Sequence, residues 1–325
     1  MLLTVIAILA GFVLLVWGAD RFVLGAGAMA RNIGVSPLLI GLTIVGFATS
    51  APEIMVSAIA SIRDNPGLAI GNAIGSNIAN IGLVLGATAL ARPMRIQSET
   101  LRREIPALLA VTLLSVMLFL DNYISRTDGV VLLLGLGLLL HWMAGLGFRS
   151  AAGDPMSAEY AAEIPADVST PTALAWFLLG LAVLLSGAWV LVWGAIKVAH
   201  ILNVSDLIIG LTVVAVGTSL PELAVSIVAA MKGEHDLAFG NIIGSNMFNL
   251  LAVIGVAASL SPNSPIRIDA EVLILHLPVM VGLTLVIFAI AYNFGGRGRV
   301  FRVEGFLLLM SFVAYQAYII KGAMD

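Results

Sequence analysis

The 325-residue chain contains no cysteine, four histidines and few charged residues. Without cysteine there is no disulfide, thiolate metal site, iron–sulfur cluster or thiol nucleophile. Charged residues make up 11% of the chain, and its 16 basic and 19 acidic residues include no basic run, which excludes a nucleic-acid-binding surface. Apolar residues make up 60%. The polar surface is too small to cover a water-soluble body of this size, so the composition indicates an integral membrane protein.

Ten apolar segments are long enough to cross a bilayer, which takes about 20 residues of helix for roughly 30 Å of hydrocarbon. The sequence therefore predicts an all-α integral membrane protein with ten transmembrane helices. Their expected ranges are 2–30, 37–62, 67–90, 103–120, 127–147, 171–200, 205–231, 236–259, 270–292 and 301–321.

A polar interval divides these helices into two sets of five. We expect a first five-helix repeat over 1–148, a linker over 149–170 and a second repeat over 171–325. Eleven of the 16 basic residues fall on the side of the linker, and basic residues are retained in the cytoplasm. The expectation is a multi-pass protein of the cell (inner) membrane with a cytoplasmic linker and both termini outside the cytoplasm.

An internal repeat relates the two halves. Residues 41–86, GLTIVGFATSAPEIMVSAIASIRDNPGLAIGNAIGSNIANIGLVLG, align without a gap to residues 210–255, GLTVVAVGTSLPELAVSIVAAMKGEHDLAFGNIIGSNMFNLLAVIG, with 22 of 46 positions identical. Five helices separate each element from its copy, and an odd number reverses its direction across the bilayer. The halves are therefore expected to be inverted about a pseudo-twofold axis, where Glu53 and Glu222 would face one another.

A carboxylate at membrane depth costs several kcal/mol, roughly 2.5–3.5 on insertion scales, unless it faces a partner or a cavity. The basic residues nearest to Glu53 and Glu222 in the repeats are Arg63 and Lys232, at the far helix ends. A cation from solution is therefore the expected counter-charge. The alternative is a protonated pair of glutamates that only holds helices together through hydrogen bonds to Ser and Asn.

A proline precedes each of these glutamates. Pro52 and Pro221 have no N–H to give and clash with the carbonyl four residues back, so the carbonyls of Ala48 and Gly217 lose their donors. Broken backbone at membrane depth is tolerated where it lines a cavity, although a simple helix kink is the alternative.

Polar side chains recur at helical spacing around the glutamates. In each repeat, the helix that carries the glutamate has Thr, Glu and Ser four residues apart, and the next helix has Asn, Ser and Asn at the same spacing. In the first repeat these residues are Thr49, Glu53 and Ser57, then Asn72, Ser76 and Asn80. In the second repeat they are Thr218, Glu222 and Ser226, then Asn241, Ser245 and Asn249. For Asn72, Asn77, Asn241 and Asn246, interhelical hydrogen bonding and ion contact are equally good interpretations. Oxygen-only ligands suit hard cations such as Ca²⁺, and zinc is not expected.

The repeated motifs resemble those of a known family. GFATSAPE with GNAIGSNIAN, and AVGTSLPE with GNIIGSNMFN, closely resemble the paired alpha-repeats of the sodium/calcium exchanger family within the cation/Ca²⁺ antiporter superfamily, most of all its short prokaryotic members. Two departures are Ala48, where the first motif usually has Gly, and Asn249, where some relatives carry Asp.

The resemblance implies an ion site. Glu53 and Glu222 would hold Ca²⁺ with the carbonyls of Thr49 and Thr218. Neighbouring Na⁺ sites would be completed by Ser50, Ser76, Asn80, Ser219, Ser245 and Asn249, and outer Na⁺ sites by the carbonyls of Gly46 and Ala215. The first and sixth helices would slide over the repeat core, with Gly25 and Gly27 among their small residues.

Two negative charges in a low-dielectric interior must be neutralised before the site crosses the membrane, and Ca²⁺ and Na⁺ would compete for the same oxygens. We therefore expect an antiporter that exchanges Ca²⁺ for Na⁺, not an enzyme, with no cofactor and with Ca²⁺, Na⁺ and the lipid bilayer as partners of a functional monomer. Alternatives are an H⁺-coupled or K⁺-handling exchanger, a passive channel, and an intramembrane hydrolase using Ser50 or Ser219.

Overall fold

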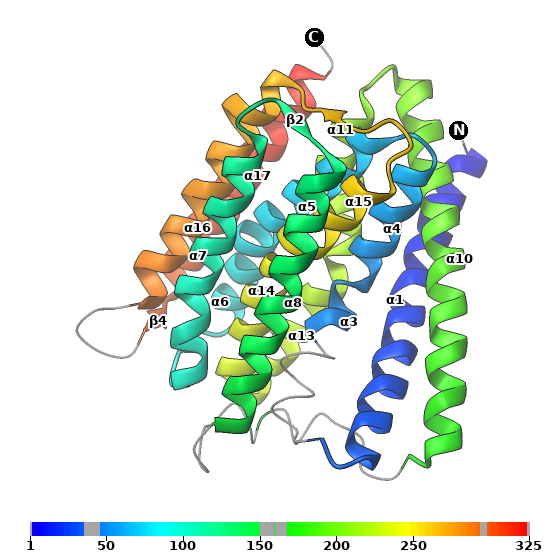
Figure 1. Cartoon of the computed structure of the whole chain (residues 1–325). Helices are drawn as coiled ribbons and strands as arrows, with labels where there is room; N and C mark the ends of the chain where they lie inside the picture. The colour runs from blue at the N-terminus through cyan, green and yellow to red at the C-terminus, as the bar shows by residue number, and fades with distance from the viewer. Residues whose placement is uncertain (1, 36–45, 150–158, 160–167, 293–297, 324–325) are drawn as a thin grey trace.

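The structure, a computed structural model, describes residues 2–35, 46–149, 159, 168–292 and 298–323. These residues form a bundle of long helices (Figure 1). The first half consists of α1 (Leu2–Asn32), α3 (Gly46–Thr49), α4 (Ala51–Ile62), α5 (Pro66–Ala79), the π-helix η2 (Asn80–Leu85), α6 (Gly86–Ala91), β1 (Met94–Arg95), α7 (Glu99–Phe119), β2 (Tyr123–Ile124) and α8 (Arg126–Arg149).

The second half repeats this order. It consists of α10 (Thr170–Leu202), α11 (Asp206–Ile209), the π-helix η3 (Gly210–Val214), α12 (Ala215–Thr218), α13 (Leu220–Lys232), α14 (His235–Phe248), the π-helix η4 (Asn249–Val253), α15 (Ile254–Leu260), β3 (Ile266–Arg267), the π-helix η5 (Val272–His276), α16 (Leu277–Tyr292), β4 (Arg299–Val300) and α17 (Arg302–Gly322).

The described helices agree with ten spans. Eight of them are long and apolar enough to cross a membrane. A ninth, α7, has 21 residues, but its first six residues include four charged ones, Glu99, Arg102, Arg103 and Glu104. The tenth is α3 with α4, and the expected residues before it, 37–45, lie outside the described ranges. The ten-helix prediction is therefore confirmed.

The two halves are inverted, as the five-helix offset predicts. In Figure 1, α3 and α4 run upward whereas α11 to α13 run downward, and both chain ends lie at the top. Two short antiparallel ladders join the halves: Met94 of β1 pairs with Val300 of β4, and Tyr123 of β2 pairs with Arg267 of β3. Each ladder thus connects a loop of one half to a loop of the other.

The helices that carry the Asn and Ser stripes form the centre of the bundle. The span Pro66–Ala91 is 83% buried and His235–Leu260 is 89% buried, whereas no other candidate span exceeds 50%. Small residues allow close approach here, since a Cβ atom at Gly71 of α5 would lie 3.1 Å from the Cα of Gly210 in η3. The two stripes meet at the centre, away from lipid, where the Asn80 amide donates to Asn246.

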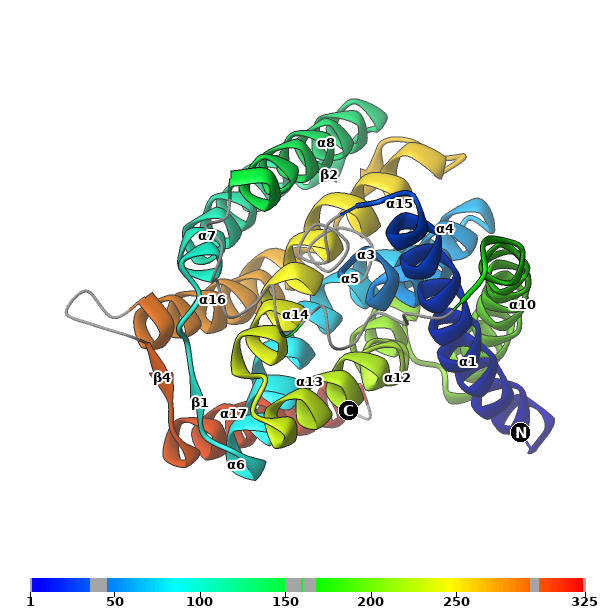
Figure 2. The same ribbon diagram turned by 90° about the horizontal axis from the view of Figure 1, so that it is seen from below.

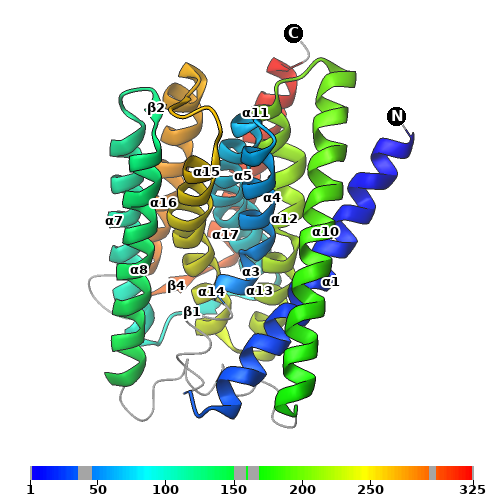
Figure 3. The ribbon, with the colours of Figure 1, turned by 45° about the vertical axis from the view of Figure 1, so that its right-hand side comes forward.

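The helices α1 and α10 lie side by side at one edge of the bundle (Figures 2 and 3). Glycines spaced seven residues apart bring their backbones together. A Cβ atom at Gly18 would lie 2.6 Å from the backbone N of Leu184, and one at Gly187 would lie 2.8 Å from that of Leu15. Gly25 packs its backbone on Phe177 of α10 in the same way. The two helices are thus in backbone contact and form a tight pair.

Candidate functional site

Each helix that carries a glutamate is interrupted at a serine, directly before the helical turn that contains the proline. Ser50 lies between α3 and α4 with φ −84° and ψ 1°, and Ser219 lies between α12 and α13 with φ −83° and ψ 2°. Proline stands in the first turn of the helix that follows in both cases, where its missing N–H costs nothing. The repeated proline therefore produces the same broken backbone in both halves, which is more than a kink.

The two glutamates lie in the first turns of α4 and α13 and are completely buried. A carboxylate in that position faces the positive end of the helix dipole. Ser245 lies between their helices, because its hydroxyl is 3.3 Å from that of Thr49, one turn before Glu53. Ser245 donates to Oε1 of Glu222 over 3.4 Å. The structure thus brings together the acidic pair that the inverted repeat predicts, and turns neither toward lipid.

Hydroxyl groups cross from one half to the other around this pair. The Thr49 and Ser245 hydroxyls lie 3.3 Å apart, and those of Ser76 and Thr218 lie 3.5 Å apart. Each threonine of a broken helix therefore meets the serine stripe of the opposite half. One mixed cluster results, built equally from both repeats.

The asparagines one turn away support the broken helices from behind. The Asn72 amide donates to the carbonyl of Glu53 over 3.2 Å and to Ser57 over 2.9 Å. In the copy, the Asn241 amide donates to the carbonyl of Glu222 over 3.4 Å and to Ser226 over 3.1 Å. Of the two roles considered for these asparagines, interhelical hydrogen bonding is the one observed for their NH₂ groups.

The second pair of asparagines also makes hydrogen bonds. The Asn77 amide donates to the Ala73 carbonyl of its own helix over 3.0 Å. The Oδ1 atom of Asn246 accepts from Asn80 over 3.3 Å, which links the two halves. Asn80 is therefore held by its NH₂ group, and its Oδ1 atom is left for another partner.

Several buried oxygen atoms of the cluster have no hydrogen-bond partner among the described residues. They are Ser50 Oγ, both carboxylate oxygens of Glu53, Asn80 Oδ1, Ser219 Oγ, Glu222 Oε2 and Asn249 Oδ1. Buried polar atoms are nearly always paired, and an unpaired one costs about 1–3 kcal/mol. Six of these seven atoms fall in pairs related by the repeat, the second oxygen of Glu53 being the exception, and each can accept a bond or bind a metal, which is the set of ligands that a hard cation takes.

The outer residues of the expected site are placed at helix starts. Gly46 is the first residue of α3, and Ala215, which is buried, is the first residue of α12. The Ala215 carbonyl accepts from the Ser219 N–H over 3.1 Å and from the Thr218 hydroxyl over 3.4 Å. In this structure that carbonyl is thus already engaged within its own turn.

Three π-helical turns adjoin the cluster and were not foreseen from the sequence. Asn80 begins η2, Asn249 begins η4, and η3 ends at Val214, directly before α12. Such turns occur often at functional sites. Gln316 of α17 donates to the Leu211 carbonyl within η3 over 3.2 Å. In the sequence, the only indication of this contact is one amide side chain in the apolar helix α17.

Phe12 of α1 lies directly against the backbone of Gly217, the residue before Thr218. A Cβ atom at position 217 would overlap the Phe12 ring. The first repeat has Ala48 at the equivalent position, so the glycine is needed in one half only. The ring thus packs against the end of α12, beside the break in that helix.

We expect Gly217→Ala to slow ion exchange about tenfold, because overpacking of this kind costs about 1–3 kcal/mol. The double variant Phe12→Ala/Gly217→Ala should recover most of the rate, since the smaller side chain makes room for the methyl group. Initial rates of radiolabelled Ca²⁺ uptake into proteoliposomes measure both effects. A Gly217→Ala rate that Phe12→Ala leaves unchanged would show that the contact is not responsible.

Known proteins resemble this chain over nearly its whole length. The sodium/calcium exchanger protein family profile matches residues 3–145 and 172–321. The putative antiporter CaxA of Alkalimonas amylolytica is 48% identical over 97% of this chain and 98% of its own length. The inner membrane protein YrbG of Escherichia coli (strain K12) is 40% identical over 81% of each chain. Solved structures of the sodium-calcium exchanger NCX_Mj superpose with a TM-score of 0.68 at 34% identity, covering 97% of this chain and 98% of the other.

Proposed function

Because the chain belongs to the sodium/calcium exchanger protein family, whose members are membrane transporters and not enzymes, we propose that it exchanges Ca²⁺ for Na⁺ by alternating access at a site built from Glu53 and Glu222. The observation that carries this proposal is the buried acidic pair, ringed by unpartnered oxygen atoms from both repeats.

The charge of the site explains the exchange. Two ionised glutamates in a water-excluded interior are tolerable only when cations cancel their charge. One Ca²⁺ ion does so, and so do several Na⁺ ions on the same oxygens. Each set of ions therefore excludes the other, and an empty site does not cross the membrane. Coupled counter-transport follows from this rule, and a passive leak does not.

The ligands divide naturally by position. We assign Ca²⁺ to the two carboxylates and the carbonyls of Thr49 and Thr218, beside the helix breaks. Na⁺ ions are assigned to the serines and asparagines around them, namely Ser50, Ser76, Asn80, Ser219, Ser245 and Asn249. The backbone carbonyls of Gly46 and Ala215 are the outermost ligands. The unpartnered oxygen atoms of four of them support the assignment.

Alternating access is assigned to the α1–α10 pair. The pair packs along α4, and α1 also contacts α3 and α12, so it borders both broken helices. Glycine-mediated backbone contact makes α1 and α10 a unit, whereas the helices of the core are joined by cross-repeat hydrogen bonds. Movement of the pair as one body over the core opens the site to one side at a time.

The coupling ion is tested by separate gradients. Radiolabelled Ca²⁺ uptake into proteoliposomes loaded with Na⁺ is expected to exceed uptake into vesicles loaded with K⁺ or an impermeant cation several-fold. A pH gradient without Na⁺ should drive little uptake, because protons are poor substitutes for a set of bound Na⁺ ions. Uptake that follows the pH or K⁺ gradient instead would favour the H⁺-coupled or K⁺-handling exchanger.

The remaining organisation follows the same proposal. The repeats occupy 1–148 and 171–325, and the linker 149–170 lies in the cytoplasm of a cell whose inner membrane holds a functional monomer, with both termini outside. Most of the linker lies outside the described residues. Its Glu159 accepts a hydrogen bond of 2.6 Å from the Leu237 N–H in the first turn of α14, which ties the linker to the second repeat.

A further inference from the structure

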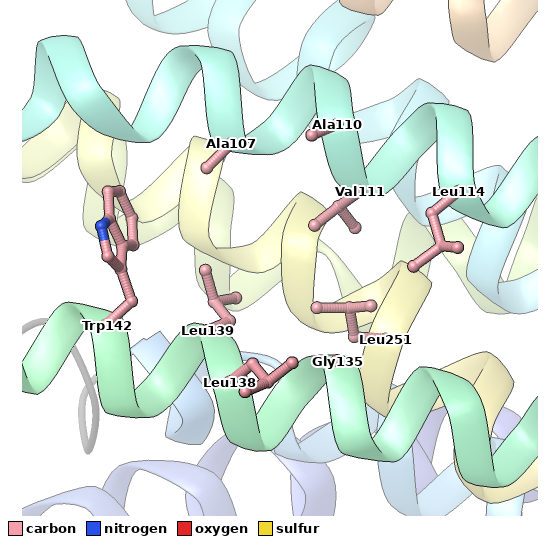
Figure 4. A pocket seen from close by; sticks show the side chains of 9 residues that line it. All are labelled: Ala107, Ala110, Val111, Leu114, Gly135, Leu138, Leu139, Trp142 and Leu251. Carbon is pink, nitrogen blue, oxygen red and sulfur yellow. The ribbon is translucent and has the colours of Figure 1, made fainter.

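The helices α7 and α8 lie on the side of the bundle opposite the α1–α10 pair (Figure 2). An apolar groove runs between them (Figure 4). Its volume is about 310 Å³. Nine residues line it, none of them charged: Ala107, Ala110, Val111, Leu114, Gly135, Leu138, Leu139, Trp142 and Leu251. Small residues on both walls, above all Ala107, Ala110 and Gly135, leave the space open. Leu251 of η4 lies beneath it (Figure 4).

The groove opens toward the lipid. Leu138 on its rim is 71% exposed and Trp142 is 36% exposed, although both are large and apolar. In a ten-span protein this surface faces hydrocarbon, where acyl chains and not water fill an apolar hollow. The stretch from Ala107 to Leu114 covers about 10 Å along the helix axis, which accommodates part of one acyl chain.

A positive charge lies at one end of the groove. Arg103 precedes Ala107 by four residues, so it lies one turn along α7 on the face that lines the groove. It is exposed. On the opposite wall, the indole of Trp142 lies across from Ala107, at this end of the groove (Figure 4). An amphipathic aromatic ring and an arginine at a membrane surface both suit a lipid headgroup.

We propose that the groove between α7 and α8 is a binding site for an anionic phospholipid, with the phosphate-bearing headgroup on Arg103 and one acyl chain between Ala107 and Leu114 above Leu251. The charge selects the headgroup, and the small side chains admit the chain. A zwitterionic lipid enters the same groove with less affinity. The inference stands apart from the proposed function, because binding does not depend on which ions are exchanged.

The test uses Trp142 as a reporter. The full-length protein with Trp17, Trp176, Trp189 and Trp193 replaced by Phe is reconstituted into phosphatidylcholine vesicles that contain a small fraction of lipid brominated on its acyl chains. Bromine quenches a tryptophan that it touches. We expect brominated phosphatidylglycerol to quench Trp142 at about fivefold lower mole fraction than brominated phosphatidylcholine, as one basic residue facing an anionic headgroup predicts.

Two variants separate the headgroup from the chain. Arg103→Gln should abolish the preference for the anionic lipid, whereas Arg299→Gln, at an exposed arginine on β4, should keep it. Ala110→Leu fills the groove and should reduce quenching by both lipids. Equal quenching by the two lipids in the parent protein, or a preference that survives Arg103→Gln, would overturn the proposal.

Discussion

Glu53→Gln and Glu222→Gln should each reduce Ca²⁺ exchange at least about hundredfold, because removing one member of a compensated buried charge set costs about 3–5 kcal/mol. Glutamine keeps the size and one oxygen of glutamate but halves the charge of the site. The charge of a bound divalent ion is then only partly neutralised, in an interior where both side chains are fully buried. Initial rates of radiolabelled Ca²⁺ counterflow in proteoliposomes measure the loss.

A third glutamate provides the control. Glu271 precedes η5 with a side chain 53% exposed, and Glu271→Gln should exchange at the parental rate. All three variants insert with the same helices, so purified yield and elution from a sizing column should agree. The alternative interpretation, a protonated pair that only packs helices, predicts that glutamine works as well as glutamate. Near-parental exchange by both site variants would therefore reject the site.

Gly180→Val should separate α1 from α10 and lower exchange about tenfold or more, since forcing a side chain into a close-packed contact costs about 1–3 kcal/mol and occasionally more. At Gly180 even a Cβ atom would overlap the backbone N of Phe22. Backbone cannot rotate away as a side chain can, so the helices must part. A lower thermal unfolding midpoint in detergent should accompany the slower exchange.

Gly137→Val is the matched control for this prediction. Gly137 lies in the apolar helix α8, where a Cβ atom would have no described atom within 4 Å. Its replacement should leave both the midpoint and the exchange rate unchanged. If Gly180→Val exchanges ions at the parental rate, the tight pairing of α1 with α10 is not needed for transport.

Much of the architecture could be predicted because membrane and repeat impose it. Apolar length placed the ten helices, and the odd number of helices between copies required the inversion. One deviation occurs where charge meets the membrane surface: the helix expected from residue 103 begins at Glu99, and four of its first six residues are charged. Hydropathy cannot register a turn that lies outside the hydrocarbon.

The pairing of the glutamates followed from symmetry, but the details around them did not. Thr49 bonding to Ser245, and Asn80 to Asn246, depends on how two helices interlock, which spacing within one helix does not specify. The π-helical turns arise in ordinary apolar sequence. Phe12 reaches Gly217 across more than two hundred residues, and neither residue is unusual for its own helix. Contacts between distant apolar residues leave no pattern in a single sequence.

Competition between the two ions at equilibrium tests the central claim most directly. Radiolabelled Ca²⁺ bound to the purified protein should be displaced by Na⁺ with a steep dependence on Na⁺ concentration, and the displaced ion should return when Ca²⁺ is raised, since several Na⁺ ions replace one Ca²⁺ on shared carboxylates. Ca²⁺ binding that does not change with Na⁺ concentration, or that persists in the double variant Glu53→Gln/Glu222→Gln, would contradict the account.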